Sequence, residues 1–215
     1  MSTLIRLAKK CLKPFPFLLP ILRPVDSLIR QLVNFKILSL KLGQIRSIYD
    51  WECVDADGEK IPWYTYPSIE FLKQLDFKEK TVFEYGSGNS TIFWSKRCKS
   101  IVSVEDNKNW FEKIAKSLPE NVDYRFTQNK DDYVNLPSLL NQKFDVIIVD
   151  GSYRNECADV AALCLKSDGF IILDNSDWFE LTSKALRNKD FIEIDMSGFG
   201  PINSYTWTTS LFLRR

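Results

Sequence analysis

Two glycines and two acidic residues in the first half of the chain have the types and the spacing of a nucleoside-binding turn. Residues 82–91 read VFEYGSGNST, so Gly86 and Gly88 follow an apolar run that contains Glu84. Glycines one residue apart allow a turn in which the backbone passes close to a ligand or to another part of the chain. Glu105 follows 19 residues after Gly86, near the spacing at which a carboxylate accepts both hydrogens of a ribose diol. The turn and the second acid together predict nucleoside binding more specifically than either does alone.

A second group of polar residues follows two later apolar runs. FDVIIVD ends at Asp150, and GFIILDN ends at Asp174 and Asn175. If both runs are parallel strands of one sheet, these oxygen atoms lie over one cleft, where they would suit a hard divalent cation that lowers the pKa of a substrate hydroxyl. In the alternative interpretation, Asp150 accepts directly from the substrate hydroxyl or from an ammonium group, and Asn175 bonds to its own loop. Tyr153 is a further candidate catalytic residue beside them.

The composition limits the chemistry that these residues can do. The 215 residues include no histidine, so any proton transfer must use a carboxylate, a tyrosine, a lysine, a cysteine or water. The five cysteines are odd in number and form no C-x-x-C pair, which indicates reduced thiols and a cytoplasmic protein. With 45% hydrophobic and 27% charged residues, the chain has the composition of a folded globular domain.

The elements that position these residues form an alternation of short apolar runs and helical patterns, which is typical of βαβ units on a parallel sheet. The five apolar runs lie at residues 81–86, 100–105, 122–128, 144–150 and 169–175. Two further strands, around residues 191–194 and 205–213, have no helix between them, so we expect an antiparallel final pair. The sequence therefore predicts an α/β fold: a doubly wound, Rossmann-like, seven-stranded sheet with the last strand antiparallel.

Residues 1–50 are predicted to form a basic helical arm that precedes the body at residues 51–215. Residues 1–46 carry nine Lys or Arg and the single acid Asp26. The longest uncharged run, Pro14–Leu22, is too short to span a bilayer and is interrupted by proline.

An amphipathic helix is expected within this arm after Pro24, with Asp26 or Ser27 as its N-cap. Its apolar residues recur at helical spacing: Val25, Leu28, Ile29 and Leu32. The favoured interpretation is packing on the body or homodimerisation through residues 1–46. A peripheral contact with an anionic membrane is the second interpretation, and nucleic-acid binding is the least favoured.

The motif EYGSGN, the downstream Glu105 and the helixless final strand pair resemble the class I S-adenosylmethionine-dependent methyltransferases. The resemblance covers residues 62–215. The family pattern is acid-x-G-x-G-x-G, and this chain departs from it with Ser90 in place of the third glycine. A nicotinamide cofactor would ask for G-x-G-x-x-G, whose sixth position here is Thr91.

The resemblance implies roles for particular residues. Glu105 would bind the ribose hydroxyls, and Asp132, or alternatively Asp131, would bind the adenine amino group. The methionine portion would be held by Glu84 and the turn that follows it, namely Gly86, Ser87, Gly88 and Asn89.

Asp150, Asp174 and Asn175 resemble the acid after the fourth strand and the Asp-Asn pair after the fifth in the cation-dependent catechol-type O-methyltransferases. This resemblance implies Mg²⁺ or another divalent cation at these three residues. The chain departs from that family where a lysine is usual, since residues 151–154 read GSYR.

These features predict a methyltransferase that uses S-adenosylmethionine and a small-molecule or glycan acceptor, with transfer to a hydroxyl. Two aromatic stretches, Ile61–Pro67 and Gly198–Trp207, would wall the acceptor site, although core packing explains Trp63 and Trp207 equally well. A non-catalytic binding or scaffold protein of the same fold, attached through its arm, is the first alternative. A nicotinamide-dependent dehydrogenase is the second.

Overall fold

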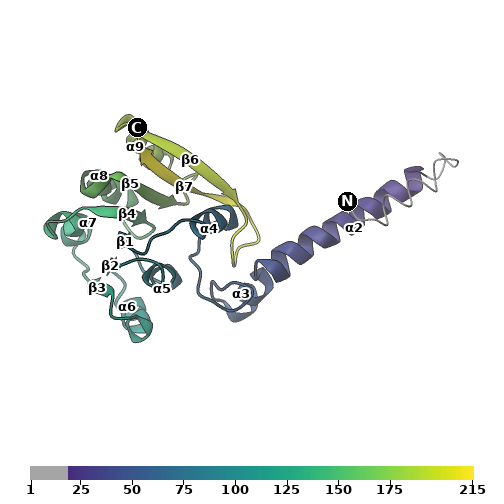
Figure 1. The fold of residues 1–215 in the computed structure, drawn as a ribbon, viewed down its shortest axis with the longest axis horizontal. Helices are drawn as coiled ribbons and strands as arrows, with labels where there is room; N and C mark the ends of the chain where they lie inside the picture. Colours follow the sequence, from purple (N-terminus) through teal and green to yellow (C-terminus); the bar gives the residue numbers. More distant parts are fainter. Residues whose placement is uncertain (1–18) are drawn as a thin grey trace.

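The computed structural model describes residues 19–215, with side chains from residue 24 onward, so Cys11 and the start of the arm lie outside it. Figure 1 shows a sheet with helices packed around it and one long helix that extends away from this body. The strands are β1 (Thr81–Tyr85), β2 (Ser100–Glu105), β3 (Val122–Phe126), β4 (Phe144–Val149), β5 (Leu165–Asp174), β6 (Phe191–Gly198) and β7 (Trp207–Arg214). The helices are α2 (Leu19–Lys36), the π-helical turn η2 (Ile37–Lys41), α3 (Gln44–Asp50), α4 (Tyr66–Leu72), α5 (Asn89–Ser95), α6 (Lys108–Ile114), the 3₁₀ turn η3 (Ala115–Ser117), α7 (Lys130–Leu139), α8 (Arg154–Cys164) and α9 (Glu180–Asn188).

The seven strands form one sheet in the order β3-β2-β1-β4-β5-β7-β6. Strands β1 to β5 pair in parallel, while β7 pairs antiparallel with both β5 and β6. The predicted fold class is therefore confirmed, including the antiparallel last strand. Because β6 and β7 are joined without a crossover helix, β7 returns between β5 and β6 in the opposite direction.

Alternate residues of the central strands pack on the two helical layers, since successive side chains of a strand point to opposite faces. Phe83 and Tyr85 of β1 pack with buried residues of α7 and α8 in one cluster. Val82 packs with buried residues of α4 and α5 in the other cluster. All six residues of β4 are buried, which explains why this run has no polar alternation.

The arm helix α2 differs from the prediction at its start. It runs from Leu19 with Pro24 inside it, so the prediction of a helix that begins after Pro24 with Asp26 or Ser27 as N-cap is wrong. Pro24 is the sixth residue of α2 and has no backbone N–H, so one hydrogen bond of the helix is missing there. Within residues 19–215, no helix is long and apolar enough to cross a membrane.

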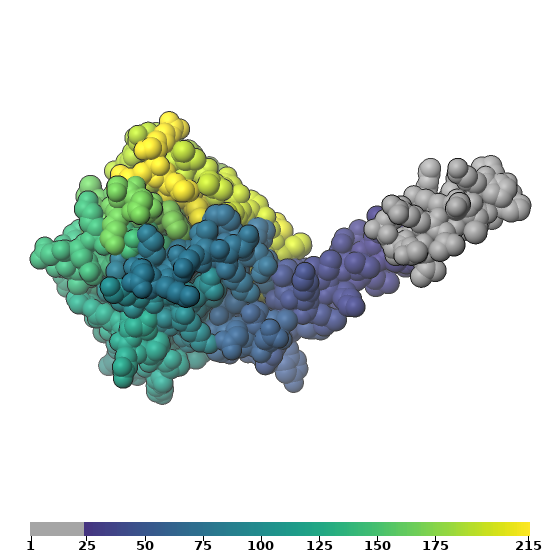
Figure 2. Space-filling view, viewed as in Figure 1, coloured from purple at the N-terminus to yellow at the C-terminus, as the bar shows by residue number. Residues whose placement is uncertain are grey.

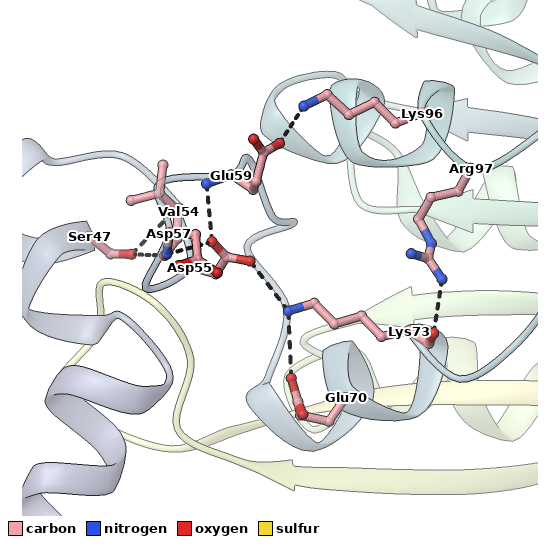
Figure 3. A network of polar contacts seen from close by, with 9 residues as sticks. All are labelled: Ser47, Val54, Asp55, Asp57, Glu59, Glu70, Lys73, Lys96 and Arg97. Carbon is pink, nitrogen blue, oxygen red and sulfur yellow. Dashed lines mark hydrogen bonds and ion pairs between the residues drawn. The ribbon is translucent and has the colours of Figure 1, made fainter.

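The segment that joins the arm to the body is held by a polar network (Figure 3). Ser47 of α3 donates to the Val54 carbonyl oxygen at 2.7 Å and accepts from the Val54 amide at 3.1 Å. Lys73 lies 3.5 Å from Asp55, and Lys96 pairs with Glu59. These contacts fix residues 51–60 against α4 and α5. Through Ser47 they also hold α3, which belongs to the expected arm at residues 1–50.

Candidate functional site

A cavity of about 620 Å³ lies at the carboxyl ends of the strands. We call it the aromatic cavity, because five of the six tryptophans of the chain line it. These are Trp51, Trp63, Trp110, Trp178 and Trp207, joined by Tyr205. Its floor carries the polar residues that follow β1, β4 and β5. Of the two aromatic stretches, residues 61–67 and 198–207, Trp63, Tyr205 and Trp207 line this cavity, although Trp207 is only 2% exposed and is also a core residue.

A smaller crevice of about 330 Å³ adjoins the aromatic cavity. It is lined by Gly86, Glu105, Asp106, Asn107, Tyr133, Gly151 and Ser152, together with three residues that also line the aromatic cavity. The shared residues are Ser87, Trp110 and Asp150. The two spaces therefore meet at the ends of β1 and β4, the neighbouring central strands.

Glu105 reaches the crevice as predicted. Its Oε1 accepts from the amides of Asp106 and Asn107 at 3.1 and 2.9 Å, and its Oε2 accepts from the Ser87 hydroxyl at 2.6 Å. Burial raises the pKa of Glu105, although the Ser87 hydroxyl and the Asn107 amide oppose the rise. The backbone thus fixes the carboxylate beside a hydroxyl, an arrangement that suits a vicinal diol.

Glu84 does not reach either cavity. It is 1% exposed, and it accepts hydrogen bonds from Ser90 and, at 2.5 Å, from Thr91. Thr91 Oγ1 in turn accepts from the Gly88 amide at 3.0 Å. Burial raises the pKa of Glu84 to about 8 despite these donors. Glu84 therefore fastens the start of α5 to the end of β1, and it does not lie where the expected contact with methionine would need it.

The glycine turn is packed against the protein's own chain. Gly86 has φ 92°, and a Cβ there would lie 3.2 Å from Gly151, whose own added Cβ would strike the Tyr133 hydroxyl. Trp110 lies over Gly88 and donates its indole N–H to the Ser87 carbonyl oxygen at 2.9 Å. The glycines thus allow the loops after β1 and β4 to touch. These two loops form the floor of both cavities.

Asp150, Asn175 and Arg154 form one connected group at the end of the sheet. The Arg154 guanidinium donates to Asp150 Oδ1 at 2.9 Å and to Asn175 Oδ1 at 3.0 Å. Asn175 has φ 54°, a left-handed conformation that Asn adopts more readily than most residues, and it lies directly after β5. Burial raises the pKa of Asp150 to about 6, and the charge of Arg154 limits the rise.

Asp174 lies beside this group in the aromatic cavity. Its Oδ1 accepts from the Trp207 indole at 3.1 Å and from Thr209 at 2.5 Å, both from β7. Burial, followed by the negative charge of Asp150, raises the pKa of Asp174 well above its ordinary value. The antiparallel strand therefore supplies the hydrogen bonds that hold this buried carboxyl group.

Solved structures share this architecture. The chain superposes with a TM-score of 0.54 on a precorrin-6y C5,15-methyltransferase from Geobacter metallireducens, at 15% identity over 69% of this chain and 87% of that one. The class I methyltransferase fold is thereby established for this protein. A methyltransferase from Pyrococcus furiosus gives a TM-score of 0.51 at 16% identity, over 68% of this chain and 81% of that one. A methyltransferase-fold protein from Streptococcus mutans, solved with S-adenosylhomocysteine, gives 0.50 at 14% identity over 66% and 93%.

No protein-family model matches the sequence, and no curated protein matches it. The methyltransferase fold is therefore established by the structural comparison, and the finer resemblance to catechol-type enzymes remains a prediction.

The arrangement does not fit a divalent cation at the predicted oxygen atoms. The Arg154 guanidinium already bridges Asp150 and Asn175, and a cation there would be repelled by this fixed positive charge. Within residues 19–215 there is also no cluster of three or more His, Cys, Asp or Glu residues that could hold a metal. In this methyltransferase fold a guanidinium occupies the position that the resemblance assigned to a metal.

Three other predicted residues lie away from the two cavities. Asp131 and Asp132 are exposed in the first turn of α7 and line neither space, because Tyr133 is the residue of this turn that faces inward. Tyr153 lines neither space, and its ring packs on Tyr133 with centroids 5.9 Å apart. Asn89 does line the aromatic cavity, where its amide donates to the Cys53 carbonyl oxygen at 2.9 Å.

Sequence reasoning assigned no role to several residues of the site, among them Arg154, Trp110, Trp178 and Thr209. Arg154 begins α8, whereas Asp150 lies in the loop before the left-handed N-cap Tyr153, so helical spacing does not predict their contact. Trp110 lies in α6 and Trp178 in the turn before α9. The sequence does not show which way these segments point, because their direction depends on the tertiary structure. Thr209 lies on β7, and its contact with Asp174 depends on strand order.

Proposed function

We propose that this protein transfers a methyl group from S-adenosylmethionine to a hydroxyl of a saccharide or other glycan acceptor. The observation that carries the proposal is the pair of adjoining spaces at the carboxyl ends of the strands. One holds a buried carboxylate beside a hydroxyl, the other is walled by tryptophans, and Asp150 lies where they meet.

The residues of the crevice suit the nucleoside half of the cofactor. Glu105 and Ser87 would bind the ribose hydroxyls, and the Gly86–Gly88 backbone would lie along the methionine half toward Asp150. Asp106 and Asn107, which line the crevice, are better placed for the base than Asp132 is. When bound, S-adenosylmethionine supplies a sulfonium-activated methyl group.

Asp150 is the proposed acceptor of the hydroxyl proton. Its Oδ1 is engaged by Arg154, and no hydrogen bond from the described residues reaches its Oδ2. With a pKa of about 6, the carboxyl group is mostly ionised at neutral pH and can take a proton. The acceptor oxygen would form a bond to the methyl carbon as the carbon–sulfur bond breaks, and the hydroxyl proton would pass to Asp150.

The walls of the aromatic cavity support a saccharide acceptor. Exposed indole and phenol rings offer apolar faces with polar edges, which suit the C–H faces of a sugar ring, while Glu52 and Asn203 offer hydrogen bonds to its hydroxyls. A small aryl alcohol would use the rings but would leave most of these polar groups without partners.

Two measurements test the proposal. Calorimetric titration should show binding of S-adenosylhomocysteine and none of NADH, and incubation with S-adenosylmethionine and a panel of oligosaccharides should give a singly methylated product detected by mass spectrometry. Binding of NADH in place of S-adenosylhomocysteine would indicate the dehydrogenase alternative. Binding of S-adenosylhomocysteine with no turnover of any hydroxyl acceptor would contradict the proposed reaction and favour a binding protein.

A further inference from the structure

The arm carries an uncovered apolar surface, which we call the arm face. It consists of Val25, Leu28, Ile29, Leu32, Val33, Phe35, Ile37 and Leu40, all of them exposed. Leu28 is 62% and Leu32 is 59% exposed. Figures 1 and 2 show that α2 extends away from the body, so the body does not cover these side chains. The expectation that the helix packs on its own body is therefore not met.

The opposite side of α2 is polar. Ser27, Arg30 and Asn34 are spaced by three and four residues and so share one side of the helix. Arg30 pairs with Asp26 at 2.9 Å, which nearly neutralises this side. The helix thus has one broad apolar face and one narrow polar face, so it is amphipathic.

The apolar surface continues onto the body at α3. Ile45, Ile48 and Tyr49 are exposed there, and Trp51, which follows the helix, is 73% exposed. Trp51 also lines the aromatic cavity. Tyrosine and tryptophan are enriched where a membrane meets water, because their rings are apolar and their edges are polar. Exposed apolar and aromatic residues therefore recur along the chain from α2 to Trp51 at the rim of the cavity.

Basic residues are in excess in the arm and acidic residues are in excess in the rest of the chain, as binding of the arm to an anionic surface requires. Residues 1–46 hold nine basic residues and one acid, whereas residues 47–215 hold 20 basic and 27 acidic residues. An anionic bilayer would attract the arm and repel the body, which would keep the arm against the surface and the body in solution.

A second copy of the chain fits the arm face less well. Val25, Leu28, Leu32 and Phe35 have the a and d spacing of a coiled coil. The flanking positions that carry complementary charges in coiled coils hold Pro24, Ile29, Gln31 and Lys36 here. Ile29 and Val33 also widen the apolar face beyond a two-helix seam.

We propose that the arm face, together with the exposed residues of α3, binds the surface of an anionic bilayer, with α2 lying in the plane of the membrane. The apolar side chains would enter the boundary between headgroups and acyl chains, and the basic residues of the arm would contact acidic headgroups. This inference stands apart from the proposed methyl transfer and does not depend on it.

The test is flotation of the full chain with vesicles of phosphatidylcholine alone and of equimolar phosphatidylcholine and phosphatidylglycerol. The chain should float with the anionic vesicles and much less with the neutral ones. The double variant Leu28→Glu and Leu32→Glu should bind at least about tenfold more weakly, since two apolar side chains would no longer enter the membrane boundary. The matched control Ser27→Glu and Asn34→Glu adds the same charge on the polar side, farther from the membrane, and should weaken binding much less than the double leucine variant does.

Far-UV circular dichroism and thermal unfolding would show that both variants remain folded, as expected for exposed positions. Equal loss of binding in the two double variants would overturn the proposal, because it would reduce the effect to charge alone. Failure of the full chain to float, with sedimentation as a dimer that the Leu28 and Leu32 substitutions dissociate, would also overturn it and would assign the arm face to a second copy.

Discussion

The guanidinium of Arg154 lies 2.9 Å from the carboxylate of Asp150, at the point where the crevice and the aromatic cavity meet. The same side chain donates to the carbonyl oxygens of Asp150, Gly151 and Asp174. One residue of α8 therefore ties together the loops that follow β4 and β5. It also provides the positive charge next to the proposed proton acceptor.

The pH dependence of methyl transfer should follow Asp150. The pKa of its carboxyl group is raised to about 6, so kcat/KM should fall below about pH 6 as the group becomes protonated. Arg154→Gln removes the positive charge that limits this rise, so the inflection should move to higher pH, whereas Arg154→Lys should move it less. Initial rates measured across pH test whether the inflection moves further in the Gln variant than in the Lys variant. An inflection that stays in place in the Gln variant would contradict the assignment of Asp150 as the proton acceptor.

Removal of divalent cations should leave methyl transfer nearly unchanged. The guanidinium of Arg154 fills the space between Asp150 and Asn175, so the reaction needs no cation there. Rates measured with EDTA and with added magnesium should agree within the error of the measurement. A loss of activity with EDTA that magnesium restores would show that Arg154 moves aside for a metal.

Glu105→Ala should weaken the binding of S-adenosylhomocysteine about tenfold or more, because charge-assisted hydrogen bonds to the ribose are lost. Calorimetric titration measures the change. Glu112→Ala is the matched control, since Glu112 is an exposed acid on α6 and should leave affinity unaltered. Equal affinity of the Glu105 variant and the wild type would remove the ribose contact from the proposal.

Glu84 should make stability fall as pH rises. Its folded-state pKa of about 8 exceeds the ordinary value of 4.5, so the folded chain keeps a proton that the unfolded chain releases within this range. The stabilising contribution is complete below about pH 4.5 and is lost as pH rises through about 8.

Glu84→Gln, which stays neutral, should therefore reduce the decline in unfolding free energy between about pH 5 and about pH 9. Denaturant titration at several pH values checks this, with Glu112→Gln as the exposed control. The same decline in the Glu84 variant and in the wild type would mean that Glu84 is already ionised in the folded protein over this range.

Trp178→Ala should raise KM for the acceptor about two- to tenfold while the affinity for S-adenosylhomocysteine stays the same, because stacking on an aromatic ring contributes about 0.5–1.5 kcal/mol. Trp178 lines the aromatic cavity but not the crevice. Leu181→Ala, an exposed change on the following helix α9 that touches neither space, is the control. Parallel losses for acceptor and cofactor would show a general structural effect.

Much of the fold and part of the site follow from the sequence because they depend on local pattern. The apolar runs at residues 144–150 and 169–175 identify buried parallel strands, and such strands present their carboxyl ends at one edge of the sheet. That rule alone places Asp150, Asp174 and Glu105 at the cavities. The absence of a helix between residues 194 and 205 likewise fixes the antiparallel return of β7.

The tertiary structure decides which polar groups face a ligand and which face the protein. Glu84 was predicted beside the cofactor, yet Ser90 and Thr91 of the next helix bind both of its oxygens. Asp132 follows a strand at suitable spacing, but the orientation of α7 turns Tyr133 inward. Five tryptophans converge on one cavity from segments that lie far apart in the chain.

The sequence by itself thus determined the order of strands and helices, the edge of the sheet that carries the site and the division of charge between arm and body. Only the tertiary structure decided that Arg154 binds Asp150 and Asn175, and that β7 holds Asp174. The physical reason is that periodicity and turn chemistry act over a few residues. The partner of a buried charge, by contrast, is set by the packing of whole elements, and a lone buried carboxylate costs too much free energy to remain without one.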